Sequence, residues 1–197
     1  MRFLKDNSEI IVKLYINQIG IAIFSLFLYT AIGAFGQEND EMSFVFKLLV
    51  SAFSVLFYFV LIYTAVWEIG AKDKIRIDGG RLERKPLKGL FVGLFANVIN
   101  FVITGVALLL SGLYLLGCGE VFKTVFAVLN LIFRLFMGMY LGLAQGISYM
   151  FTVADDVKFF IETAAFLVLP LLSVLVVHFA YQMGLNEKRI FPARKQN

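Results

Sequence analysis

The chain has 197 residues, of which 60% are hydrophobic and only 16% are charged, and its formal net charge is +4. Soluble domains are about 45–50% apolar and about 25% charged, so the composition excludes a water-soluble globule. With one cysteine and one histidine, the chain cannot form an internal disulfide and lacks the residues for an imidazole or thiolate metal centre.

The apolar residues are gathered into charge-free runs, each at least as long as the roughly 20 residues that cross a bilayer as a helix. Because the hydrocarbon layer offers the backbone no hydrogen-bond partner, helix is the expected conformation. We therefore predict an all-α, polytopic integral membrane bundle that forms a single transmembrane domain over residues 1–197. The first run is about twice as long as the apolar core of a signal peptide, so it is expected to be a retained span. The five predicted hydrophobic helices cover about 8–35, 44–69, 89–116, 121–151 and 159–182.

The connection 70–88 is strongly basic, with seven cations against three anions. The positive-inside rule places such a loop in the cytoplasm, together with the N-terminus, and leaves the acidic segment 37–41 outside. Within the loop, residues 75–82 alternate between apolar and polar around Asp-Gly-Gly, a pattern that predicts a small β-hairpin. Its cations are candidate contacts for anionic lipid headgroups or a protein partner: Lys72, Lys74, Arg76, Arg81, Arg84, Lys85 and Lys88.

The segment 121–151 leaves the number of full spans open between four and five. A full span would put the basic C-terminal tail outside, against the charge rule, whereas a re-entrant segment would keep all basic regions on one side. The octapeptide Trp67–Lys74 resembles Tyr181–Lys188, and a duplicated hairpin would likewise place both on one side. An unbroken helix is favoured instead by a small-residue stripe at i, i+4 and i+8, a candidate helix-packing surface. The stripe consists of Gly138, Gly142 and Gly146.

Polar residues inside the apolar runs form a candidate intramembrane site, because such residues are costly in lipid and often functional. Each also has a structural explanation. A cation can reach the membrane surface along its own stem, amides can bond neighbouring helices, and a carboxylate suits a helix N-terminus. The candidates are Arg134, Asn130, Asn97, Asn100 and Glu162.

No zinc-protease, phosphate-loop or nucleophile-elbow motif occurs in the chain. We therefore expect no enzyme activity, no catalytic residue, no metal, no cofactor and no nucleic-acid partner. Two functions stay open. The first is a small transport-related protein or permease subunit with a polar intramembrane site. The alternative is a non-catalytic membrane scaffold or partner subunit that uses the glycine stripe and the basic loop. Either would suit a bacterial inner membrane, as a homo-oligomer or with a membrane partner subunit.

Overall fold

The computed structural model describes residues 2–35, 40–117 and 120–190, and no strand occurs within these ranges. Five of its helical segments are long and apolar enough to cross a membrane, so the prediction of a helical membrane bundle is confirmed. The elements are α1 (Arg2–Phe35), α2 (Asp40–Asp78), α3 (Lys88–Ala96), α4 (Val98–Leu115), α5 (Glu120–Met137), the 3-10 turn η1 (Gly138–Tyr140), α6 (Leu141–Tyr149) and α7 (Asp155–Leu185).

The outer surface of the helices is apolar, unlike that of a soluble protein. Large apolar side chains face outward along the helices, as at Phe53 on α2 and Leu109 on α4, which are 57% and 71% exposed. Hydroxyl side chains such as Ser51, Thr104 and Ser173 are fully buried. An apolar exterior of this extent is stable against lipid and not against water.

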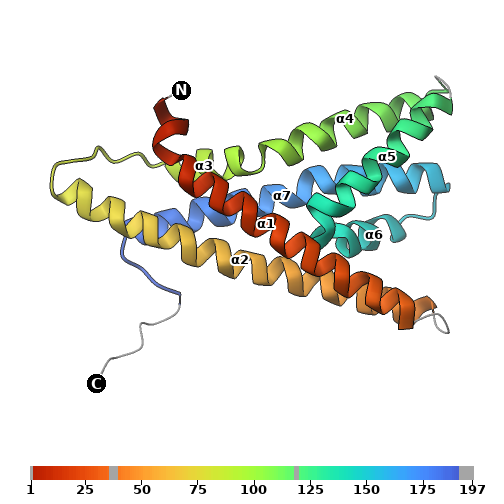
Figure 1. Cartoon of the computed structure of the whole chain (residues 1–197), viewed down its shortest axis with the longest axis horizontal. Helices are drawn as coiled ribbons and strands as arrows, with labels where there is room; N and C mark the ends of the chain where they lie inside the picture. The colour runs from red at the N-terminus through yellow and green to blue at the C-terminus, as the bar shows by residue number, and fades with distance from the viewer. Residues whose placement is uncertain (1, 36–39, 118–119, 191–197) are drawn as a thin grey trace.

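The long helices cross the bundle alternately, and the start of α1 and the end of α7 lie at the same end of it (Figure 1). Helix α1 leaves that end and α2 returns to it; α3 and α4 together cross again, and α7 returns. The connection 79–87 lies at this end too. Lys188 and Arg189, which follow α7, are at the same end of the bundle. At the opposite end, α7 begins with Asp155 and Asp156. We call the two the basic end and the acidic end.

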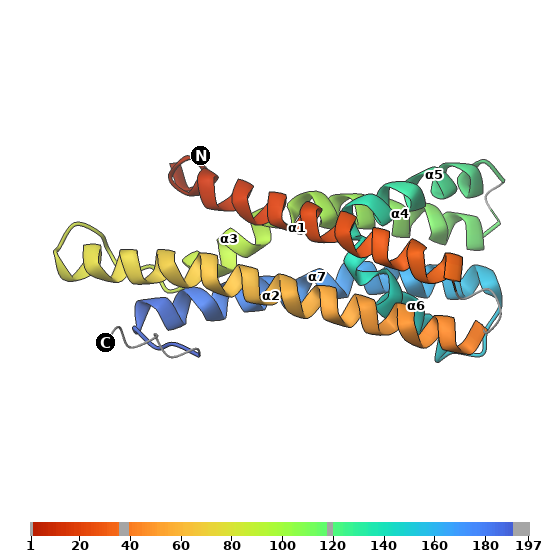
Figure 2. The same ribbon diagram turned by 60° about the horizontal axis from the view of Figure 1, so that its bottom comes forward.

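The segment between α4 and α7 does not cross the bundle. Helix α5 starts at the acidic end and reaches the middle, where the Thr104 hydroxyl of α4 lies 3.7 Å from the sulfur of Met137. The chain then turns at η1, and α6 comes back, so that Tyr149 packs on Phe44 near the start of α2, with ring centroids 5.0 Å apart. Figure 2 shows this turn from a second side. In the structure this segment forms a re-entrant hairpin that begins and ends at the acidic end of the bundle, in place of one continuous helix over 121–151. The candidate span Leu131–Tyr149 contains its turn.

The glycine stripe is divided by this turn and packs inside the chain. A Cβ on Gly138 would lie 2.8 Å from the carbonyl oxygen of Ala22 on α1. A Cβ on Gly142 would overlap the Lys47 carbonyl oxygen and lie 2.5 Å from the Ser51 hydroxyl of α2. The two glycines therefore allow the hairpin to sit directly against the backbones of α1 and α2.

The predicted β-hairpin over 75–82 is wrong, because α2 continues through the first part of the predicted loop to Asp78. A bond from Lys74 Nζ to Asp78 Oδ1 at 2.6 Å supports this last turn. The helix then ends in a Schellman motif: Arg81 N donates to the carbonyl of Arg76 at 2.9 Å, and Gly80 has a φ of +68°. The Asp-Gly-Gly sequence supplies the left-handed residue that this helix end requires and not a hairpin turn.

Helices α2 and α7 run in the same direction and touch at the basic end through the two similar octapeptides. A Cβ on Gly70 would lie 3.0 Å from Gly184 Cα and overlap the Tyr181 carbonyl. A Cβ on Gly184 would in turn lie 2.9 Å from Gly70 Cα and overlap the Trp67 carbonyl. The contact is thus reciprocal between equivalent positions of the two octapeptides.

We predict that residue 152 lies on the opposite side of the membrane from residue 84. In a background with the sole cysteine replaced, Cys118→Ser, the variants Thr152→Cys and Arg84→Cys should react with an impermeant maleimide from opposite sides. If both react from the same side, 121–151 is a full span and the re-entrant arrangement is incorrect.

We also predict that Gly142→Ala is destabilising, because the added methyl has no room against α2; overpacking of this kind costs about 1–3 kcal/mol. The matched control is Gly105→Ala on α4, where a Cβ meets nothing within 4 Å and where alanine should be neutral or favourable for the helix. Unfolding in SDS, followed by circular dichroism, compares the two. Equal effects would contradict the close packing of the hairpin.

Candidate functional site

The helical path is interrupted twice in the middle of the bundle, and the first break is at Asn97, between α3 and α4. Its side-chain amide donates to the Gly93 carbonyl at 3.0 Å and to the Ser173 hydroxyl of α7 at 3.1 Å. Asn100 then donates to Asn97 Oδ1 at 3.2 Å. Both asparagines are 1% exposed, so two neutral amides are held in the interior at the level of this break.

Helix α7 is continuous through this level but contains Pro170. Proline has no backbone N–H, so the carbonyl four residues earlier, at Phe166, loses its helical donor. The Ser173 hydroxyl donates to the Pro170 carbonyl at 2.7 Å while it accepts from Asn97. Ser173 therefore joins the proline turn of α7 to the break between α3 and α4.

The second break is η1, the turn of the re-entrant hairpin, and it brings Tyr140 to the same place. The Tyr140 side chain is completely buried, and its hydroxyl lies beside Ser173 and near Tyr58 of α2. The Tyr58 hydroxyl in turn donates to Gln18 Oε1 of α1 at 3.5 Å. Side chains from α1, α2, α4, η1 and α7 thus meet around one polar region.

We call this region the polar cluster: Gln18, Ser54, Tyr58, Asn97, Asn100, Tyr140 and Ser173. Four of its polar atoms form no hydrogen bond within the described part of the chain: Gln18 Nε2, Ser54 Oγ, Asn100 Oδ1 and the Tyr140 hydroxyl. A buried polar group without a partner costs about 1–3 kcal/mol. The cluster therefore carries both donors and acceptors that a small polar ligand or water could satisfy.

The backbone at the turn, in contrast, is satisfied by two serines. The Ser25 hydroxyl of α1 donates to the Gly138 carbonyl at 3.4 Å, at the end of α5. The Gly142 amide donates to the Ser51 hydroxyl of α2 at 2.8 Å, at the start of α6. Non-helical backbone is tolerated at membrane depth where side chains supply such partners. The hairpin is thus fixed by α1 and α2.

The structure separates the five predicted polar candidates. Asn97 and Asn100 lie in the polar cluster. Glu162 lies toward the acidic end, where its Oε1 accepts from the Ser148 hydroxyl at 3.0 Å. It is eleven residues before Ser173, or roughly 16 Å along α7. Arg134 and Asn130 belong to α5, and their side chains are outside the described part of the structure.

The basic residues of 70–88 are placed in several ways. Lys88 Nζ lies 2.6 Å from Oδ2 of Asp73, which is only 2% exposed and also accepts from the Tyr181 hydroxyl at 2.9 Å. Lys74 bonds to the neighbouring Asp78 on α2. The remaining cations are exposed, on the last turns of α2 or in the connection that follows: Lys72, Arg76, Arg81, Arg84 and Lys85.

Several members of the polar cluster do not follow from the sequence analysis. Gln18 and Ser173 lie within apolar runs and Tyr140 follows Gly138, but none has a polar neighbour at helical spacing that marks it. The available signal was the interruption itself, since glycine and proline within apolar segments indicate broken helices.

The chain matches no protein-family model, and no curated protein or solved structure resembles it significantly.

We predict that Ser51→Ala destabilises the protein by about 1–3 kcal/mol, because the buried Gly142 amide loses its acceptor. Ser54→Ala, one turn further along α2, removes a hydroxyl without a described partner and should be neutral or stabilising. Unfolding in SDS measures both. If Ser54→Ala lowers the free energy of unfolding as much as Ser51→Ala does, the turn does not depend on the bond from the Gly142 amide to Ser51.

Proposed function

We propose that this protein is a small transport-related membrane protein or permease subunit, and that the polar cluster is part of its solute path. The observation that carries the proposal is the meeting of two helix interruptions, at Asn97 and η1, with the Pro170 turn of α7 around Ser173. In transporters, substrate sites near the bilayer midplane are commonly formed by such discontinuous helices. A purely structural bundle gains nothing from burying polar atoms without partners.

The chemistry of the cluster favours a neutral polar solute. Its side chains are amides and hydroxyls, which offer donors and acceptors without a net charge. An ion would lose its hydration shell on reaching this depth, and neutral side chains would compensate for only part of that cost. Hydrogen bonding to a small hydroxylated or amide compound fits the cluster better.

The charge distribution supports an orientation with the basic end in the cytoplasm, as the positive-inside rule requires. Both termini and the connection 79–87 would then be cytoplasmic, and a bacterial inner membrane is the setting that we propose. We propose that it acts as a homo-oligomer or with a membrane partner subunit.

The alternative function, a membrane scaffold, receives less support. Its proposed docking surface was the glycine stripe, and Gly138 and Gly142 pack against α1 and α2 of the same chain. A scaffold would have to use another face of the bundle.

The proposal predicts that Tyr140→Phe reduces transport without loss of stability, because the deleted hydroxyl has no partner among the described residues. Losing one hydrogen bond to the solute corresponds to about a fivefold decrease in permeability. The permeability of proteoliposomes is measured by stopped-flow light scattering, with glycerol and urea as neutral probes. Chloride serves as an anionic probe, because Arg134 would favour an anion.

The control is Tyr149→Phe, which makes the same chemical change at an exposed ring near the acidic end and should retain full permeability. A second variant, Arg134→Leu, tests whether the cation of α5 contributes to the path. Permeability equal to that of protein-free liposomes for all three probes would contradict the transport function.

A further inference from the structure

A separate polar cavity lies between α1 and α2 at the basic end, away from the polar cluster. Its volume is about 330 Å³. Helix α1 contributes Glu9 and Lys13, one turn apart, and α2 contributes Glu68, Lys72 and Arg76, also at successive turns. Residues at this spacing share one helix face, so two charged stripes face each other across the cavity.

Asp73 and Lys88, which also line the cavity, pair with each other, whereas the five stripe side chains form no ion pair among the residues that the structure describes. Within the described part of the chain, the ion pairs closer than 4.0 Å are Lys74–Asp78, Lys88–Asp73 and Lys158–Asp155. None involves the five side chains of the two stripes. The cavity thus offers cations and carboxylates side by side, each available to a ligand that carries both signs of charge.

The cavity lies at the depth of lipid headgroups. Trp67 and Tyr63, at the end of the charge-free part of α2, are residue types that favour the interface between lipid and water. Glu68 and Lys72 follow on the basic side of these aromatics, and Glu9 lies before the apolar part of α1. A ligand in the cavity would be in the headgroup layer.

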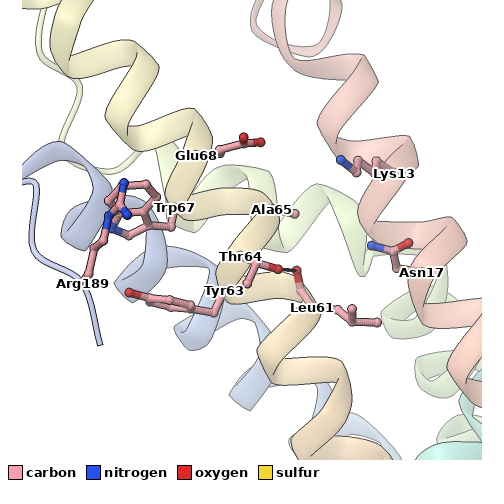
Figure 3. Close-up of a pocket in the computed structure, with 9 residues that line it drawn as sticks. All are labelled: Lys13, Asn17, Leu61, Tyr63, Thr64, Ala65, Trp67, Glu68 and Arg189. Carbon is pink, nitrogen blue, oxygen red and sulfur yellow. Dashed lines mark hydrogen bonds between the residues drawn. The ribbon is translucent and has the colours of Figure 1, made fainter. Parts of the chain in front are cut away.

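A second concavity, of about 500 Å³, continues from the first toward the hydrocarbon (Figure 3). The two share Lys13, Ala65 and Glu68. Figure 3 shows Lys13 projecting from α1 toward α2, with Leu61 deeper along the same groove. From Glu68 to Leu61 the groove extends roughly 10 Å along α2. The lining of the second concavity also includes Asn17 and Arg189, so the pair of cavities passes from a charged region to a more apolar one, as a lipid does.

We propose that this groove binds a phospholipid whose headgroup carries a primary amine, such as phosphatidylethanolamine. The phosphate would bond to Lys13 or Lys72, and the ammonium would donate to Glu68 or Glu9. One acyl chain would lie over Ala65 and Leu61. An anionic lipid without an amine would satisfy the cations alone, and a choline headgroup cannot donate a hydrogen bond to the carboxylates.

The sole tryptophan, Trp67, lines the larger cavity on the side of α2 that carries Tyr63, beside Arg189, and its fluorescence reports brominated chains at this cavity. The full-length protein is reconstituted with phosphatidylcholine and increasing amounts of a lipid with brominated acyl chains, which quench tryptophan fluorescence on contact. Brominated phosphatidylethanolamine, phosphatidylcholine and phosphatidylglycerol are compared. We expect the ethanolamine lipid to bind about three- to tenfold more tightly than the choline lipid and more tightly than the glycerol lipid.

The variant Glu68→Gln should reduce this preference to parity with the choline lipid, because the ammonium loses its acceptor. Glu83→Gln removes the same charge from the exposed connection at the same end and should leave the preference unchanged. If Glu68→Gln does not fold, Glu9→Gln tests the same contact from α1. Equal quenching by all three lipids, or preference for phosphatidylglycerol, would overturn the proposal; the latter would indicate attraction to surface charge alone.

Discussion

The hydrocarbon layer provides no water for the backbone, and the architecture of this protein depends on how it meets that constraint at one turn. At η1 the helical ladder stops at membrane depth. The serines Ser25 and Ser51 supply the partners that the chain on either side of the turn would otherwise lack. Without them the hairpin of α5 and α6 would expose polar backbone in the apolar interior, at a cost of several kcal/mol for each group. The positions of Tyr140 and of the polar cluster follow from this turn.

The hairpin also explains why the chain places small residues where it does. Its close approach to α1 and α2 requires glycine at Gly138 and Gly142, where a Cβ would meet backbone atoms. Tight packing of this kind replaces the hydrophobic driving force that is missing between helices in lipid. At the basic end, the buried pair of Asp73 and Lys88 connects α2 to the start of α3, and it orders the chain just before the break at Asn97.

The amount of structure that could be predicted from the sequence varied with the range of the interactions involved. Helices followed from the length of the apolar runs, which is a local property. The course of 121–151 needed long-range information: the glycine spacing favoured a continuous helix, whereas the charges of the flanking segments favoured a re-entrant one. The error at 75–82 arose because Asp-Gly-Gly serves both hairpin turns and helix ends, and only the preceding helical turn distinguishes them.

The candidate site was predictable only in part for the same reason. Asn97 and Asn100 could be predicted together, because their spacing places both on one helix face. Gln18, Tyr58 and Tyr140 come from separate elements, and their proximity is a product of tertiary packing. Arg134 was selected because a charge within an apolar run is rare. The side chains that meet at the breaks are neutral, and residues of these types are common in apolar runs.

The contact between α2 and α7 has a further consequence. Gly70 and Gly184 exchange equivalent neighbours, which is the pattern of an isologous interface, the kind that two identical chains make about a two-fold axis. Between separate chains, the occupancy of such an interface depends on protein concentration. Here both halves are part of one polypeptide, so the interface has a fixed one-to-one stoichiometry. It forms at any expression level, and the two halves are free to diverge in sequence wherever they do not touch.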